Sequence, residues 1–325
     1  MNRIILIFIF IAALSGSGVA FAANTTTETQ FFQFVYPASA ESVVAPVVAT
    51  ADDVYDSMAR RYGLVALAGS GRIEVIIARD EDAFFRAQPA RGGVDPWVAG
   101  TAYPALDLII LSLEPDHFFR LPEIFRHEVS HITLFRAFGR QHPPRWFDEG
   151  LAIVMAGEGV AQRFQTAAAA AMTEGLIPFD QLLTQFPNPA PQAQLAYAQS
   201  AVFIQFLRQQ HFLDVRLPTL TGSIRAGVPF EQAFAFQFGA PILELEQVFM
   251  HSLQGTWSWF TVLTGASVVW AALAVLFLMV YMRKKRRIAS ARKSLGQVDE
   301  DEELWPPTPL RVHRRDVILD KSGDG

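Results

Sequence analysis

The chain of 325 residues contains no cysteine, which excludes disulfide bonds and catalysis by a thiol. Its formal net charge is only −5, so it lacks the large basic excess that is typical of nucleic-acid-binding proteins. It also lacks sequence repeats of the period found in solenoid proteins. Charged residues are absent from a hydrophobic run near the start and from a longer run over residues 257–282. These two runs divide the chain into four parts.

The first hydrophobic run has the pattern of a secretory signal peptide. Arg3 gives a basic start, Ile4–Leu14 is apolar, and Ala20-Phe21-Ala22 is a cleavage sequence of the A-x-A type. We therefore expect residues 1–22 to be removed. The alternative is an uncleaved membrane anchor, for which this apolar run is short.

The second run, residues 257–282, is long enough to span a bilayer as one helix. Trp257, Trp259 and Tyr281 lie at its ends, and such aromatic side chains favour the membrane interface. Residues 283–287 are all Arg or Lys and follow at once, which predicts that this end faces the cytoplasm. The alternative is a buried core helix.

Four segments are therefore expected: a signal peptide (1–22), an extracytoplasmic domain (23–256), a transmembrane helix (257–282) and a cytoplasmic tail (283–325). The predicted protein crosses the cell membrane once, and its N-terminal domain is periplasmic or extracellular. The tail is charged in blocks, including an acidic run at 299–303, and is expected to be disordered. Two interpretations of the tail stay open, as a docking segment for a cytoplasmic partner or as a solvated end without one.

The central motif of the domain is Phe125-Arg126-His127-Glu128-Val129-Ser130-His131. Pro122 suits the first turn of a helix and Gly139 suits its stop, so we expect a helix between them. On that helix His127 and His131 lie on one face, one turn apart, where two imidazoles can bind one Zn²⁺. Glu128 lies about 100° further round, within reach of a metal-bound water. This is the H-E-x-x-H arrangement of zinc metalloproteases.

A zinc site of this kind needs a third protein ligand and an open position. Glu149 is the best candidate, because the chain can turn after Gly139 and return on a second helix that carries it. Asp148 and His142 are rival ligands. Asp148 is also a candidate for capping or orienting the second helix, or for supporting a ligand by a hydrogen bond.

The two motifs together, H-E-x-x-H and then Trp146-Phe147-Asp148-Glu149-Gly150-Leu151-Ala152, resemble those of the gluzincin metallopeptidases, in particular the peptidase-MA-like domains. The resemblance implies one Zn²⁺ per chain, held by His127, His131 and Glu149, with Glu128 as general base. It also assigns Tyr197, at the head of a later helix, as a donor to the oxyanion, although a plain core tyrosine fits equally well. The G-x-M-E-N type segment of the aminopeptidases is missing, which disfavours that activity.

The expected fold class is α+β, with a thermolysin-like division into a small N-terminal mixed sheet with helices and a helical C-terminal half, followed by the transmembrane helix. We interpret residues 25–30 as a polar lead-in and expect strands at 31–36 and 72–78. We also expect a strand pair within 97–111. The resemblance to the gluzincins implies an edge strand beside the zinc that pairs with extended substrate, and this pair is the candidate for that edge. Helices are expected at 41–62 and 80–85 and, after residue 152, over most of the domain.

The expected function is a membrane-anchored zinc metalloprotease that acts on protein or peptide substrates, more as an endopeptidase than as an exopeptidase. Zinc would lower the pKa of its water to near 7, and Glu128 would take the proton. An inactive tethered binding or scaffold protein with the same fold is the alternative. A purely structural zinc site is a third interpretation, but a convincing fourth protein ligand is missing.

Overall fold

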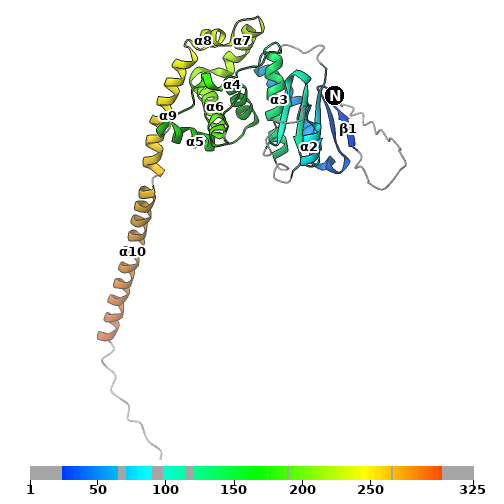
Figure 1. The fold of residues 1–325 in the computed structure, drawn as a ribbon. Coiled ribbons are helices and arrows are strands. Elements are labelled where there is room, and N and C mark those ends of the chain that lie inside the picture. The colour runs from blue at the N-terminus through cyan, green and yellow to red at the C-terminus, as the bar shows by residue number, and fades with distance from the viewer. Residues whose placement is uncertain are drawn as a thin grey trace, which may run out of the picture. The chain divides into compact units, whose positions relative to one another are not determined.

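The computed structural model describes residues 24–64, 71–89, 98–114, 120–173, 175–188, 190–264 and 266–301, and within these the side chains of 256–269 and 291–301 are not described. The chain divides into two compact units, Met1–Ser258 and Trp259–Gly325. The predicted signal peptide (1–22) and Trp97 lie outside the described residues. The first unit holds a sheet and most of the helices (Figure 1).

The sheet has five strands in the order β1-β2-β3-β5-β4. The strands are β1 (Asn24–Glu28), β2 (Phe32–Pro37), β3 (Ile73–Ala78), β4 (Gly100–Tyr103) and β5 (Leu108–Ser112). The three central strands run parallel, while β1 and β4 pair antiparallel at the two edges. The expected mixed sheet is thus confirmed, and the strand pair placed within 97–111 forms one edge of it.

Strand β1 corrects one expectation, because residues 25–28 are a strand and not a polar lead-in. Three threonines favour extended backbone, and the hairpin to β2 is fixed by side chains. Thr27 Oγ1 lies 2.9 Å from the Tyr36 hydroxyl, and Asp52 accepts a hydrogen bond from Thr29 Oγ1 at 2.8 Å. This polar edge strand covers the side of β2 that would otherwise be exposed.

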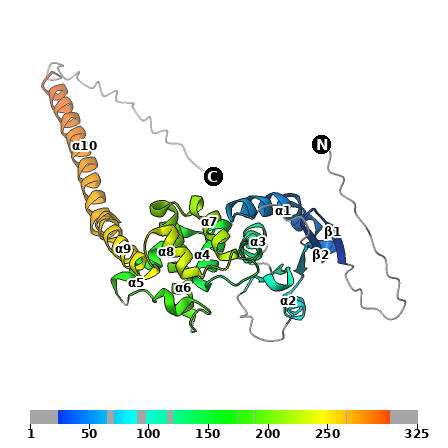
Figure 2. The ribbon, with the colours of Figure 1, turned by 90° about the horizontal axis from the view of Figure 1, so that it is seen from above.

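Helices cover both faces of the sheet. Helices α1 (Glu41–Arg61) and α3 (Leu121–Ala137) pack on one face, and α2 (Glu81–Ala87) packs on the other, as Figure 2 shows. Strand β3 explains this arrangement: Ile73, Val75 and Ile77 point into the larger core, while Ala78 and β5 Ile110 meet α2 Phe84 on the other side. A strand buried on both faces reads as an almost continuous apolar run.

The second half of the unit is helical, as expected. Its helices are α4 (Arg145–Ala156), α5 (Val160–Met172), α6 (Ala190–His211), α7 (Leu213–Arg225), α8 (Phe230–Phe238) and the first part of α9 (Ile242–Thr264), with a short 3₁₀ helix at Phe179–Leu182. Helix α3 contacts the sheet half through α1, β4 and β5, and contacts the helical half through α4. It therefore joins the two halves, together with α1, which contacts α7.

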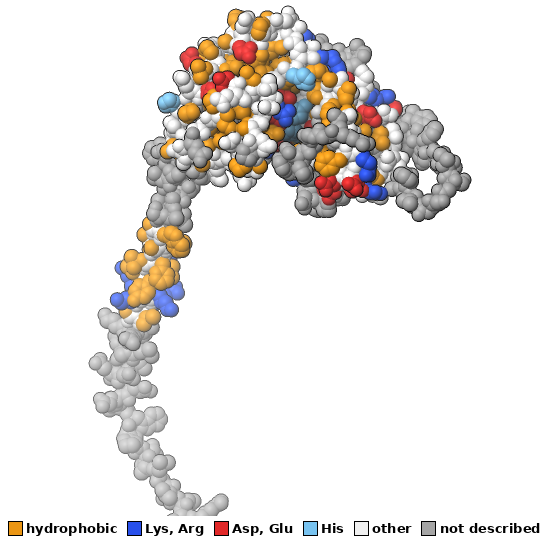
Figure 3. Space-filling model, in the orientation of Figure 1, with side chains coloured by type: hydrophobic (Ala, Val, Ile, Leu, Met, Phe, Trp, Pro, Cys, Tyr) orange, Lys and Arg blue, Asp and Glu red, His pale blue; other side chains and the backbone are white. Residues whose placement is uncertain are grey.

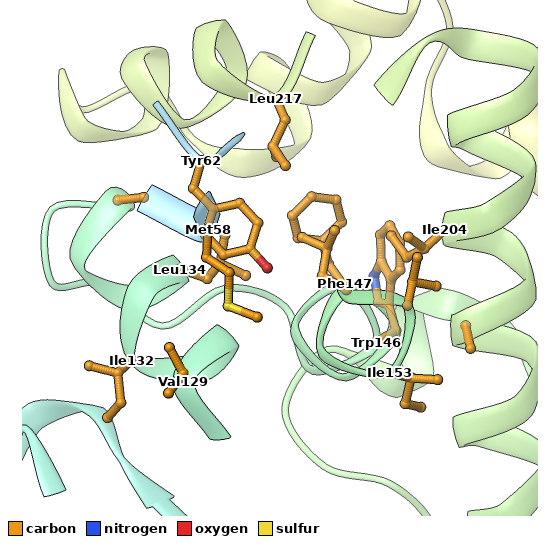
Figure 4. Packing of buried hydrophobic residues seen from close by; sticks show 14 of the residues in the cluster. Met58, Tyr62, Val129, Ile132, Leu134, Trp146, Phe147, Ile153, Ile204 and Leu217 are labelled. Atoms are coloured by element: carbon orange, nitrogen blue, oxygen red, sulfur yellow. The ribbon is translucent and has the colours of Figure 1, made fainter. Parts of the chain in front are cut away.

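One hydrophobic core runs through both halves. Figure 4 shows Met58 and Tyr62 from the end of α1, Leu134 of α3, Phe147 of α4 and Leu217 of α7 gathered around a common centre. All five are buried, and the Tyr62 hydroxyl lies 2.6 Å from Ser130 Oγ of α3. The position of α3 is thus set by packing from several elements.

The second unit contains helix α10 (Ala266–Asp301). It continues over residues 283–301, where a disordered tail was expected, because Ala, Arg, Lys and Leu are good helix formers. Among the described residues, no helix combines the length and apolarity needed to cross a membrane. The predicted span includes residues 257–269, whose side chains are not described. The rest of the tail, 302–325, also lies outside the described residues.

Candidate metal centre and active-site cleft

Helix α3 is fixed along its length by its own side chains. Pro122 lies in its first turn, and Gly139 follows its end with a φ of 70°. Arg136, which is almost fully buried, donates hydrogen bonds to Asp107 of the β4–β5 connection at 3.0 Å and to Tyr55 at 2.8 Å. A helix bound to both the sheet and α1 in this way presents its histidines in a fixed direction.

Helix α4 brings the third carboxylate to the histidines. The chain turns after Gly139, and Pro144 precedes the first residue of α4. Gly150 allows α4 to lie very close to α6, because a Cβ atom there would be 2.6 Å from the Ser200 carbonyl oxygen. Glu149 is thereby carried to the face of α4 that meets α3.

His127, His131 and Glu149 each offer one ligand atom, and these atoms all lie within 4.8 Å of one another. Glu149 Oε2 is 3.5 Å from His127 Nε2 and 3.9 Å from His131 Nε2. A tetrahedral zinc ion with ligand distances of about 2.0–2.2 Å separates its ligand atoms by about 3.3 Å. The three side chains therefore fit one zinc ion after small adjustments.

Electrostatics favour an ionised Glu149. Its side chain is only 4% exposed, and burial alone would raise the pKa of the carboxyl. The charge of Arg145 and the two histidines outweigh this effect and hold the pKa of Glu149 well below its usual range. A carboxylate that stays ionised while buried is suited to bind a cation.

Each histidine has a second carboxylate behind it. His131 Nδ1 donates to Asp148 Oδ1 at 2.8 Å, and His127 Nδ1 donates to Glu158 Oε1 at 2.7 Å. Because a carboxylate only accepts, both Nδ1 atoms carry the proton and both Nε2 atoms are left for a metal. Asp148 thus lies behind His131 as a hydrogen-bond partner. It does not belong to the three-residue metal group found among the described residues.

Glu158 is a site residue that the sequence motifs did not indicate. It follows Gly157, which ends α4 with a φ of 79°, and its other oxygen accepts a hydrogen bond from Arg163 at 2.6 Å. Arg126 of α3 holds the end of α4 through the Ala156 carbonyl oxygen. One clue in the sequence could have pointed to Glu158. The H-E-x-x-H motif has two histidine ligands, each of which needs a hydrogen-bond acceptor behind it, and Asp148 can serve only one of them.

Replacing Glu158 with glutamine is expected to weaken zinc binding about 10–100-fold, the usual effect of losing a carboxylate behind a histidine ligand. Zinc affinity can be measured by competition with a chromophoric chelator. Glu28→Gln, which breaks an exposed ion pair with Arg72 (3.1 Å), is the control and should keep the wild-type affinity. Equal affinities of all three proteins would show that Glu158 does not support His127.

His142, the other rival ligand, lies in the same cleft but does not join the cluster. Its ring packs against Phe135 with the ring centres 4.9 Å apart. Among the described residues, the three-residue metal group consists of His127, His131 and Glu149. His142 is thereby left as part of the wall.

Glu128 lies next to the metal group and is 6% exposed. Burial raises the pKa of its carboxyl, and the neighbouring His127 and His131 oppose this shift. Strand β4 passes directly over it: a Cβ atom on Gly100 would lie 2.9 Å from Glu128 Oε1 and 2.8 Å from Ile124 Cγ2. Only glycine at position 100 leaves room for Glu128 in this conformation.

The sequence predicts Glu128 as the general base of peptide hydrolysis. On that prediction, changing Gly100 to alanine is expected to displace Glu128 and to lower the rate by about 10–100-fold, since a shift of about 1 Å in a catalytic group has effects of this size. Zinc content should stay the same, because the metal group does not contact position 100. Steady-state rates and metal analysis on the same preparations test this. Gly71→Ala is a matched control, because a Cβ there meets nothing within 4 Å. Full activity of Gly100→Ala would contradict the argument.

Tyr197 of α6 lines the same cleft. Burial and the charge of Glu149 raise the pKa of its hydroxyl, so the phenol keeps its proton and can donate it in a hydrogen bond. Its ring packs edge-on against Phe186, with the ring centres 4.7 Å apart, and the charge of the Arg145 side chain acts on its hydroxyl. Tyr197 is thus placed by neighbours on two sides.

The cleft has a volume of about 760 Å³ and is bounded on one side by β4 and its continuation to Leu106. The other walls come from α3, the start of α4 and the Glu158–Arg163 pair. Figure 3 shows charged and histidine side chains gathered between the helices and the sheet. Strand β4 is the last strand of the sheet, so among the described strands its outer edge has no partner.

Comparison with known proteins identifies a family for this site. The family model of the peptidase MA superfamily matches residues 90–255, slightly more than half of the chain. A search of curated proteins found no relative. The matched region includes β4, β5, α3 and α4, and therefore every residue of the metal group and Glu128.

Proposed function

We propose, since the chain belongs to the peptidase MA superfamily, that it is a zinc-dependent metallopeptidase of the gluzincin type. The observation that carries this proposal is the convergence of His127, His131 and Glu149 beside Glu128 in one open cleft. Three protein ligands with space beside them are typical of a catalytic zinc site, whereas structural sites are closed by four.

A zinc ion held by these three residues would supply a water of pKa near 7 and polarise the substrate carbonyl. Glu128 takes a proton from the attacking water and passes it to the nitrogen of the leaving amine as the peptide bond breaks. Tyr197 donates a hydrogen bond to the carbonyl oxygen as negative charge develops on it. Asp148 and Glu158 hold the two histidine rings in place.

The substrate is an extended peptide, and the enzyme acts as an endopeptidase. Support comes from the free edge of β4, whose main chain can pair with a peptide running along the cleft. The sequence also lacks the G-x-M-E-N type segment with which the gluzincin aminopeptidases bind the amino terminus of the substrate. A peptide can then extend past the metal group in both directions.

The location proposed for this activity is the outer face of a cell membrane, with the chain crossing once after the peptidase domain. This rests on the signal-like start, on the uncharged run at 257–282 and on the basic segment that follows it. The partners would then be proteins or peptides close to that surface. Protease protection of the domain and of the tail in sealed cells tests the orientation.

The test of the activity uses the full chain purified in detergent. We expect about one zinc per chain and cleavage of unfolded protein and of internally quenched peptides blocked at both ends. Removal of zinc by a chelator should abolish cleavage, and zinc should restore it. Zinc and peptide binding without any cleavage would instead support the inactive binding or scaffold protein. A well-folded chain that takes up no zinc would overturn the proposal.

A further inference from the structure

The carboxylate of Glu149 has different partners on its two oxygens. Oε2 faces the histidines, 3.5 Å from His127 Nε2 and 3.9 Å from His131 Nε2. Oε1 lies 2.7 Å from Arg145 Nη2, a short contact between two charged groups. One oxygen of the carboxylate therefore faces the metal group, while the other is paired with Arg145.

Arg145 is itself held in place from several directions. It is the first residue of α4, and its backbone N–H donates to the Leu183 carbonyl oxygen at 2.7 Å. Its guanidinium lies over the Phe186 ring at 5.9 Å. The planar guanidinium has several donors in fixed directions, so it can hold the Glu149 carboxylate in one orientation.

We propose that Arg145 is a positioning residue that makes Glu149 a ligand through one oxygen only, and thereby keeps a coordination position open for water and substrate. This inference rests on the proposed function, since it concerns a zinc ion at the His127, His131 and Glu149 group.

The physical argument compares two ways in which a carboxylate binds a metal. A carboxylate binds with one oxygen or with both, and the second oxygen takes a further coordination position. Catalytic zinc needs three protein ligands and one open position. Without Arg145, Glu149 Oε1 would lose its charged partner inside a site where its side chain is only 4% exposed. The metal would then be the nearest cation for that oxygen.

An ordinary helix ion pair is the alternative interpretation, because residues 145 and 149 are four apart. Such pairs on exposed helix faces contribute little to stability. The pair here differs because its carboxylate is a member of the metal group and its arginine lines the cleft. The two interpretations predict different metal coordination after Arg145 is removed.

The test replaces zinc with Co²⁺ in the full chain and records the visible d–d absorption, which weakens as the coordination number rises. The variant is Arg145→Met, which keeps an unbranched apolar stem without the guanidinium charge. Arg208→Met is the control, because Arg208 pairs with Asp214 at 2.9 Å in the α6–α7 region and does not contact the metal group. Spectra are taken at saturating Co²⁺.

We expect one Co²⁺ per chain in all three proteins and clearly weaker bands in Arg145→Met alone. Wild-type bands in Arg145→Met would overturn the inference, and so would complete loss of Co²⁺ binding in that variant. If Arg145→Met does not fold, the same comparison with Arg145→Gln decides the question. A wild-type chain that binds no Co²⁺ would count against the metal site itself, which is a distinct failure.

Discussion

Glu128→Gln is expected to lower peptide hydrolysis by about 10²–10⁴-fold while leaving the zinc content at about one per chain. Glutamine has the same shape but cannot take the proton from the attacking water. The side chain is 6% exposed and lies under Gly100, so the neutral amide fits without a change in packing. The measurement is kcat/KM on a quenched peptide, with metal analysis of the same sample.

The matched control is Glu123→Gln, which alters a glutamate on the same helix whose partner is Arg120 at 2.9 Å. That variant should hydrolyse the peptide at the wild-type rate. A Glu128→Gln protein with near-wild-type activity would refute the role assigned to Glu128. A variant that loses zinc as well as activity would show that Glu128 serves the metal and not the proton transfer.

Glu149→Ala is expected to reduce bound zinc from about one per chain to nearly none after dialysis. The change removes one of three ligands, so the loss of affinity should exceed the roughly 10–100-fold effect expected for Glu158→Gln. It also leaves Arg145 without its carboxylate partner. Zinc content by atomic absorption and affinity by chelator competition provide the two measurements.

Asp148→Ala separates Glu149 from its rival on the same helix. Asp148 touches His131 only through Nδ1, so this change should weaken zinc binding but not abolish it. Unchanged zinc in Glu149→Ala together with its loss in Asp148→Ala would make Asp148 the third ligand. If neither change matters, His142 in the wall of the cleft becomes the residue to replace next.

Much of the site could be predicted because its main residues lie close together in the sequence. Two histidines four residues apart on a helix share a face whatever surrounds them, and the stop and turn residues Gly139 and Pro144 predict a returning helix. The mixed sheet and helical half were also predicted. What the pattern could not show is how closely α3 and α4 pack, and therefore which second carboxylate reaches His127.

The residues that were missed depend on contacts between distant segments. Glu158 reaches His127 only because Gly157 turns the chain back toward α3. Gly100 matters because β4 passes over Glu128, which no spacing along the chain reveals. Strand β1 lacks the usual hydrophobic alternation, and helix α7 contains Pro218, so both carry weak local signals.

The shared core also decides where the independently folding domain begins. The family match starts at residue 90, yet β5 forms its parallel pairing with β3, and Phe125 of α3 packs on Phe32 and Phe34 of β2. A fragment limited to residues 90–255 would lack Phe32 and Phe34, so it would expose the Phe125 ring that packs on them, and it would leave Arg136 without Tyr55. The minimal folding unit therefore starts near residue 24, well before the region that the family model matches. Domain boundaries taken from the family match alone would yield an insoluble fragment.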